Sequence, residues 1–238
     1  LALFRGISRL YRIKELRISC YIDRRSLSKK MVSLLGRFKF LEVLDFKHLS
    51  DFYTPSLFKR LIHLQSISLA GNGQYDLSSL LEKMSKLPKI RSITTKFDEK
   101  AGSTKLKFLQ NPSNLKSLAL MDVRNLSLKK GDFGYLAKLS HLEHLEYEST
   151  LQKESSYVIN IFENIPANTT LKSVALDIKA FPSMDYAARL ISNFSTIKQL
   201  DLSFVASPKL LGFFPNLYLQ LEKLSINIFI KGKELAEP

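Results

Sequence analysis

Residues 61–72 have the sequence LIHLQSISLAGN, and the six residues LQSISL at 64–69 set the frame from which the fold follows. Apolar side chains occupy the first, fourth and sixth positions of this frame, as Leu64, Ile67 and Leu69. An amphipathic helix repeats apolar residues at steps of three and four, whereas a half-buried strand alternates them throughout. A step of three followed by a step of two predicts a turn that leads into a short strand, whose fourth and sixth positions point inward.

The same frame returns nine times along the 238 residues. Its copies are IKELRI (13–18), LEVLDF (41–46), LQSISL (64–69), IRSITT (90–95), LKSLAL (115–120), LEHLEY (142–147), LKSVAL (171–176), IKQLDL (197–202) and LEKLSI (221–226). Successive copies start 23 to 29 residues apart, and the eight intervals sum to 208 residues, a mean of 26. Each unit is too short to bury its own apolar face, so we expect neighbouring units to stack into a solenoid.

The frame resembles the leucine-rich repeat, L-x-x-L-x-L-x-x-N, and the resemblance covers nearly the whole chain. It implies an α/β fold, an arc-shaped solenoid with a concave parallel β-sheet and with helices or turns on the convex side. We expect a single leucine-rich repeat domain over residues 1–238, with about nine repeats, that is a fragment of a longer protein. Only Asn72 supplies the asparagine of the ninth position. This irregularity resembles the repeats of F-box proteins and of plant immune receptors of the NLR class.

The segments between the copies carry helical spacing. Residues 77–88, 156–165 and 183–194 each place apolar side chains on one stripe, and Thr54 followed by Pro55 is a start signal for a helix. The triplet at 132–134, Asp-Phe-Gly, matches the metal-binding triplet of protein kinases. Neither a glycine-rich loop nor an H-R-D motif accompanies it, so we expect a turn that leads into the next helix.

No arrangement of residues in the sequence predicts catalysis, a metal site or a cofactor. His63 and His141 both stand directly before the first residue of their copies, which indicates a repeat position rather than a metal ligand. Cys20 is the single cysteine, so no internal disulfide can form, and we expect an intracellular protein of the cytoplasm or nucleus. No apolar run reaches the roughly 18 residues that span a bilayer. We therefore expect a non-enzymatic protein without cofactors and without a membrane span.

The net charge of +14 raises nucleic acid or an acidic protein as a partner. The outward positions of the nine copies hold nine basic and ten acidic residues, a net charge of −1 for the predicted concave face. The remainder then carries 14 + 1 = +15. A groove that follows phosphates should be basic along its length, which argues against nucleic acid on the concave face. Basic stretches at 23–30 and 126–131 are candidates for contact with an acidic protein or nucleic acid on the convex side, or are simply solvated.

We expect the partner-binding surface on the concave face, over repeats three to six. Small outward side chains form a smooth floor there, and Phe97 and Met121 beside it offer apolar anchors ringed by polar groups. Clustered carboxylates at Glu143, Glu146 and Glu148 can select a basic complement. The predicted contact residues are Ser66, Ser68, Ser92, Thr94, Lys96, Phe97, Ser117, Ala119, Met121, His144, Glu146 and Glu148.

Three functions fit these features. The leading hypothesis is the substrate-binding repeat domain of an intracellular F-box-type ubiquitin-ligase adaptor, which the segment LKSLALMDV (115–123) and the mean spacing resemble. The second is the ligand-sensing repeat domain of a plant-type NLR immune receptor. The third is a basic scaffold subunit of a nucleic-acid-containing assembly, with its convex side on phosphate.

Overall fold

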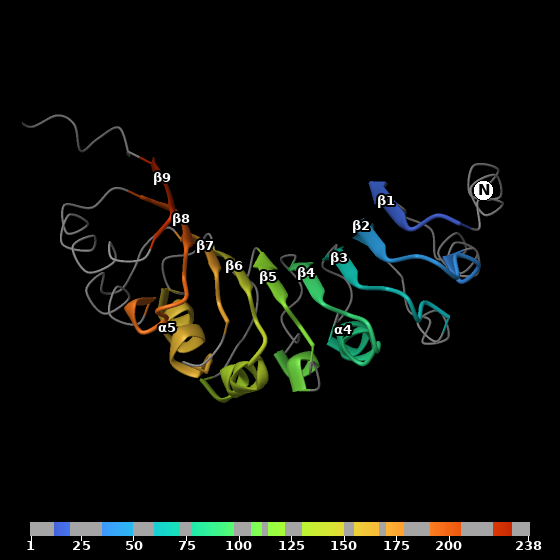
Figure 1. Cartoon of the computed structure of the whole chain (residues 1–238), viewed down its shortest axis with the longest axis horizontal. Helices are drawn as coiled ribbons and strands as arrows, with labels where there is room; N and C mark the ends of the chain where they lie inside the picture. The colour runs from blue at the N-terminus through green and yellow to red at the C-terminus, as the bar shows by residue number, and fades with distance from the viewer. Residues whose placement is uncertain are drawn as a thin grey trace, which may run out of the picture.

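A computed structural model of the chain describes residues 12–19, 35–49, 60–71, 78–97, 106–110, 114–121, 130–149, 155–166, 170–178, 191–205 and 221–229. These residues form nine strands that pair in chain order into one parallel sheet (Figure 1). The strands are β1 (Glu15–Ser19), β2 (Val43–Leu49), β3 (Ser66–Gly71), β4 (Ser92–Lys96), β5 (Ser117–Met121), β6 (His144–Ser149), β7 (Ser173–Ile178), β8 (Gln199–Val205) and β9 (Lys223–Phe229). Every strand begins at the third position of one copy of the frame, so the predicted strands are confirmed.

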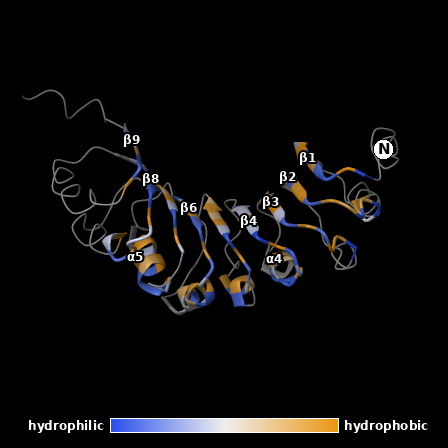
Figure 2. Ribbon diagram, viewed as in Figure 1, coloured by the Kyte–Doolittle hydropathy of each residue, from blue (hydrophilic) through white to orange (hydrophobic). Residues whose placement is uncertain are grey.

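The register of the sheet aligns equivalent positions of successive repeats. Leu44 pairs with Ile67, Ile67 with Ile93, Ile93 with Leu118, and Leu118 with Leu145. All five side chains are buried. Along β4, for example, residues alternate between buried and partly or fully exposed, and Figure 2 shows both hydrophobic and hydrophilic residues within the sheet. The residues predicted to point inward are all buried: Leu44, Phe46, Leu118, Leu120, Leu200 and Leu202.

The backbone at the amino end of the strands repeats one hydrogen-bond pattern at all eight junctions between the described strands. The carbonyl at the second position of a copy accepts hydrogen bonds from the amides of the second and third residues of the next copy. At one junction, the Lys116 carbonyl accepts from Glu143 at 2.8 Å and from His144 at 2.9 Å. At the next, the Glu143 carbonyl accepts from Lys172 at 2.8 Å and from Ser173 at 3.1 Å. This pattern holds the second positions of neighbouring repeats side by side along the amino edge of the sheet.

The convex side carries short helices, which line the outer side of the arc (Figure 1). Within the described residues they are the α-helices α4 (Ser78–Ser85) and α5 (Ser155–Asn164) and the 3-10 helices η1 (Leu106–Gln110) and η3 (Lys130–Lys138). The helices predicted within 77–88 and 156–165 are thus confirmed. The start signal at Thr54 and Pro55 lies outside the described residues, as do most of 183–194 and the basic stretches at 23–30 and 126–129.

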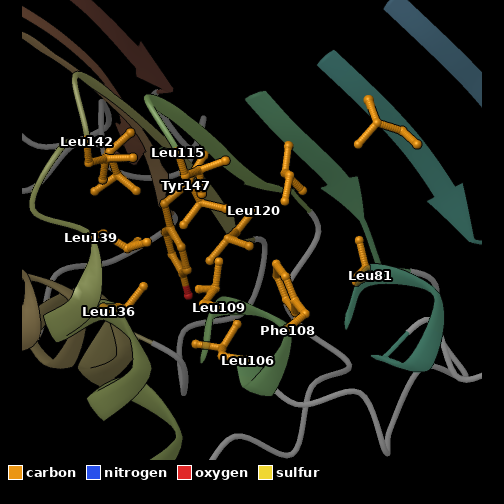
Figure 3. Close-up of a cluster of buried hydrophobic side chains, with 14 of the residues drawn as sticks. Leu81, Leu106, Phe108, Leu109, Leu115, Leu120, Leu136, Leu139, Leu142 and Tyr147 are labelled. Atoms are coloured by element: carbon orange, nitrogen blue, oxygen red, sulfur yellow. The ribbon is translucent and has the colours of Figure 1, made fainter. Parts of the chain in front are cut away.

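Side chains from these helices complete the core beneath the sheet. In α4, Leu81 and Met84 are buried, and η1 contributes Leu106, Phe108 and Leu109. They pack with residues of β5 and β6, among them Leu120 and Tyr147 (Figure 3). The sequence predicts no helix at η1, because five residues are too few to show a helical period.

The Asp-Phe-Gly triplet at 132–134 lies within η3. Phe133 is fully buried and packs against Tyr157 of α5, with ring centroids 5.4 Å apart. A turn that leads into a helix was expected here, and the triplet is itself part of a 3-10 helix. Its phenylalanine therefore joins two neighbouring repeats through the core.

Candidate functional site

The concave face over β3, β4 and β5 presents two aligned rows of small side chains. The rows are Ser66–Ser92–Ser117 and Ser68–Thr94–Ala119. The serines and Thr94 are half-buried, whereas Ala119 is 4% exposed because it lies between Thr94 and Glu146 of the adjacent strands. The rows form a level surface without projecting side chains, which we call the small-residue floor.

Phe97 does not lie on this face, so its assignment as a partner contact is wrong. Its side chain is fully buried, and its amide donates a hydrogen bond to the Met121 carbonyl at 2.9 Å. Phe97 occupies the eighth position, which follows the inward fourth and sixth positions in the alternation of a strand. The chain continues in an extended path for one residue beyond β4, and the aromatic ring therefore turns into the core.

Lys96 and Met121 remain beside the floor at the carboxyl end of the strands. They pair in the register of β4 and β5, with Lys96 exposed and Met121 half-buried. Met121 is thus the predicted apolar anchor that retains accessible surface. The side chains of Ile178 and Phe204, at comparable places farther along, lie outside the described part of the chain.

The predicted acidic cluster is divided between two surfaces. His144 and Glu146 are exposed on the outward face of β6, and Glu148 is partly exposed on the same face. Glu143 instead precedes the strand and lies on the amino edge of the sheet, where two lysines from adjacent repeats neutralise it. The acidic character of the concave face at β6 therefore rests on Glu146 and Glu148.

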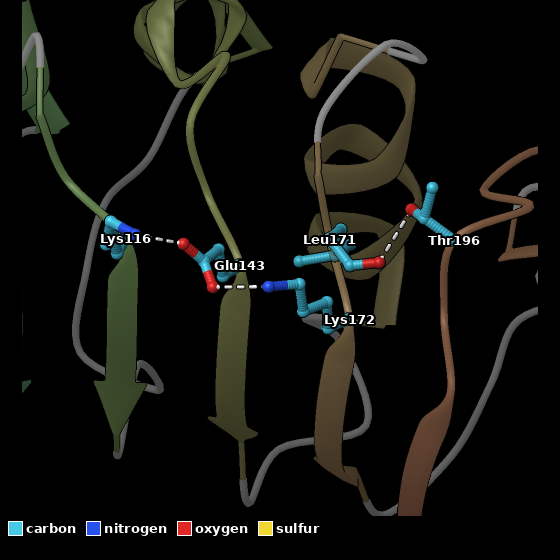
Figure 4. A network of polar contacts seen from close by, with 5 residues as sticks. All are labelled: Lys116, Glu143, Leu171, Lys172 and Thr196. Carbon is cyan, nitrogen blue, oxygen red and sulfur yellow. Dashed lines mark hydrogen bonds and ion pairs between the residues drawn. The ribbon is translucent and has the colours of Figure 1, made fainter. Parts of the chain in front are cut away.

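Figure 4 shows the ionic contacts of Glu143 at the amino edge. Lys116 forms an ion pair with Oε1 of Glu143, and Nζ of Lys172 lies 2.8 Å from Oε2. Hydrogen bonds from Lys116 and Lys172 lower the pKa of the Glu143 carboxyl to about 2. The same edge carries ion pairs between Lys14 and Glu42 and between Lys198 and Glu222. Because these residues share the second position of their repeats, each of these carboxylates lies beside a lysine of an adjacent repeat.

Described residues of this edge line two open recesses. The first, which we call the apolar recess, is lined by Gly36, Lys39, Phe40, Arg60, Ile62 and His63. The second, which we call the basic recess, is lined by Pro88, Lys89, Arg91, Asn114, Lys116, His141, Glu143 and Thr170. The sequence analysis predicted neither recess. The sequence signal for the apolar recess is the pair of large apolar residues Phe40 and Ile62, which lie just ahead of their copies and outside the apolar positions of the frame.

The described residues contain no group of three or more histidine, cysteine, aspartate or glutamate side chains placed to hold a metal ion. None of the helices in the described part of the chain is both long enough and apolar enough to cross a membrane.

No protein-family profile matches the chain, and no curated protein matches it. Among solved structures, the leucine-rich repeat-containing protein LegL7 from Legionella pneumophila is similar, with a TM-score of 0.53 and 17% sequence identity. The match covers 87% of this chain and 72% of LegL7. This likeness and the nine aligned repeats show that the chain has the leucine-rich repeat fold, as the sequence predicts.

Two complexes show weaker likeness. The structure of TLR13 with ssRNA13 matches with a TM-score of 0.49 and 15% identity, over 94% of this chain and 34% of that chain. The structure of the yeast Rad7 and Elc1 complex matches with a TM-score of 0.44 and 11% identity, over 94% of this chain and 75% of that chain.

Proposed function

We propose that this leucine-rich repeat solenoid is a protein-recognition module that binds its partner on the concave face, centred on repeats three to six. The observation that supports this most directly is the small-residue floor, which runs in register across β3, β4 and β5. Small side chains let the backbone of a partner approach closely, and serine and threonine hydroxyls can both donate and accept hydrogen bonds to it.

The borders of the floor supply the remaining features of an interface. Met121 offers a flexible apolar side chain on one border, and Lys96 stands next to it in the register. On the other side, Glu146 and Glu148 of β6 present carboxylates that favour a basic complement. Nine strands about 4.8 Å apart give a sheet about 40 Å along its arc, which is long enough for an interface of standard size.

The specific role that we propose is recognition of substrates for an intracellular F-box-type ubiquitin-ligase adaptor. The irregular repeats and the mean spacing support it, and an F-box elsewhere in the parent protein would support it further. A nucleotide-binding domain in the parent protein would instead favour ligand sensing in an NLR-type immune receptor.

The concave-face hypothesis is tested by blocking the floor. Ser68→Arg together with Thr94→Arg places two long cationic side chains on neighbouring strands of the floor. Proteins that copurify with the chain from cells should be lost from this variant, as measured by quantitative mass spectrometry. Lys107→Glu is the matched control, because Lys107 is exposed on η1 at the convex side. If the Ser68→Arg, Thr94→Arg variant keeps the partners and Lys107→Glu loses them, binding on the concave face is refuted.

The third role, a basic scaffold on nucleic acid, has a distinct signature in solution. Contacts with phosphates release counterions, so the affinity for an RNA or DNA oligonucleotide should fall steeply as salt rises. A salt-insensitive interaction would exclude this role.

A further inference from the structure

Two large apolar side chains on the amino edge of the sheet are exposed to solvent. Phe40 is 50% exposed and Ile62 is 52% exposed, and both line the apolar recess. The other large apolar side chains exposed among the described residues, Leu224 and Ile226, belong to β9, the outermost described strand. Phe40 and Ile62 instead belong to repeats two and three, which have a neighbouring repeat on either side. The lack of a neighbouring repeat therefore does not account for their exposure.

The flanks of the apolar recess and the neighbouring basic recess carry cations that have no carboxylate partner among the described residues. Lys39 and Arg60 border the apolar side chains, and Lys89 and Arg91 line the basic recess. Among the described residues that line the basic recess, the one carboxylate is Glu143, and it already pairs with Lys116 and Lys172. The local excess of positive charge is therefore available to an incoming anion.

His63 joins the two recesses into one surface. Its ring stacks on Phe40 with centroids 6.1 Å apart, and its Nδ1 lies 3.0 Å from Nζ of Lys89. A lysine ammonium has only donors, so Lys89 is the donor in this contact. The apolar and basic recesses thus meet at the contact between His63 and Lys89 and form one band along the amino edge, which we call the amino-edge surface.

We propose that the amino-edge surface binds an extended acidic segment of a protein partner that carries one aromatic or aliphatic anchor. The anchor occupies the apolar recess against Phe40 and Ile62, and carboxylates downstream or upstream of it pair with Lys89 and Arg91. Phe40 on repeat two and Arg91 on repeat four are two strand spacings apart, about 10 Å, which an extended segment covers with about three residues. This surface is separate from the small-residue floor, so it adds a second docking site to the proposed recognition module.

The composition of the band favours a peptide over a nucleic acid. Single-stranded nucleic acid binds through successive base-stacking platforms and a continuous run of cations. Here the aliphatic Ile62 offers no stacking platform, and Glu143 interrupts the cations. An apolar anchor beside unpaired cations is instead complementary to an acidic peptide.

The probe for the test is a phage-displayed library of random octapeptides, selected on the whole chain. We expect enrichment of peptides with one large apolar residue and at least two acidic residues within six positions. Synthetic versions of these peptides should bind with an affinity that falls as salt rises, because exposed charge pairs are screened. Failure to enrich peptides of this composition would overturn the proposal.

Variants then locate the binding site. Phe40→Ser with Ile62→Ser, and Lys89→Glu with Arg91→Glu, should each weaken the selected peptides at least tenfold, measured by fluorescence anisotropy. Lys107→Glu on the convex side and Ser68→Arg with Thr94→Arg on the floor should leave the affinity unchanged. Peptides that tolerate the amino-edge variants, or that are lost on blocking the floor, would overturn the assignment. Displacement of the peptides by an equimolar single-stranded octanucleotide would overturn it in favour of nucleic acid.

Discussion

Replacement of Leu118 by alanine should destabilise the centre of the solenoid by about 3–4 kcal/mol. Leu118 is fully buried in β5, between Ile93 of β4 and Leu145 of β6. The loss of Cγ, Cδ1 and Cδ2, at about 0.8 kcal/mol for each carbon, accounts for about 2.4 kcal/mol of transfer free energy. The cavity adds to this, because strands on both sides hold their side chains in place and limit collapse, and measured costs of such changes are about 2–5 kcal/mol.

The assay is urea unfolding followed by circular dichroism, combined with amide hydrogen exchange. Ile62→Ala is the matched control, because Ile62 is half-exposed, and it should cost less than about 1 kcal/mol. Since repeats couple mainly to their neighbours, faster exchange should concentrate in β4, β5 and β6 rather than in β8. A loss below about 0.5 kcal/mol, or one equal to that of Ile62→Ala, would refute the assignment of the fourth position to the core.

Two further predictions concern polar groups around this core. Because Lys116 and Lys172 lower the folded-state pKa of Glu143 from 4.5 to about 2, its ionised form contributes stability above pH 4.5 that is lost as the pH falls toward 2. Glu143→Gln should therefore lower the free energy of unfolding, measured with urea, by about 0.5–1 kcal/mol at pH 7 and by progressively less below pH 4.5. The control is the same substitution in a Lys116→Met, Lys172→Met background, where its effect on the free energy of unfolding should not show this pH dependence. Thr95 fills a sixth, inward position, and its buried Oγ1 has no hydrogen-bond partner among the described residues. Thr95→Val should raise the free energy of unfolding by about 1 kcal/mol, and a destabilised variant would show that the hydroxyl is satisfied.

The architecture could be predicted because nine copies of the frame each predict the same turn and short strand. A single copy such as LQSISL is compatible with many local structures, but nine copies in one frame leave few alternatives to a stacked solenoid. The frame also determines the register, since equivalent positions pair across every junction. The adjacency of Lys116, Glu143 and Lys172 follows from it, because all three occupy the second position of successive repeats.

The position of Phe97 could not be decided in the same way. The alternation of a strand places the eighth position inward only if the chain stays extended past the seventh, and no residue type at that point fixes the path. The sequence analysis therefore placed Phe97 on the exposed face, although its side chain is buried. The recesses at the amino edge also depend on the turns ahead of the copies, which supply Phe40, Ile62 and Lys89 and differ in sequence from copy to copy, so the frame alone does not predict them.

The division between buried and exposed positions allows binding and folding to be perturbed separately. The core side chains of the central strands are nearly inaccessible, whereas Ser68, Thr94 and Arg91 retain accessible surface. Substitutions at exposed positions away from special backbone geometry usually change stability by no more than about 0.5 kcal/mol. Loss of a partner from a floor or edge variant whose unfolding curve matches the wild type therefore reports on recognition. Because the floor crosses β3, β4 and β5 while the amino edge carries the residues ahead of those strands, one continuous sheet presents both proposed docking surfaces, and variants of each surface separate their contributions to binding.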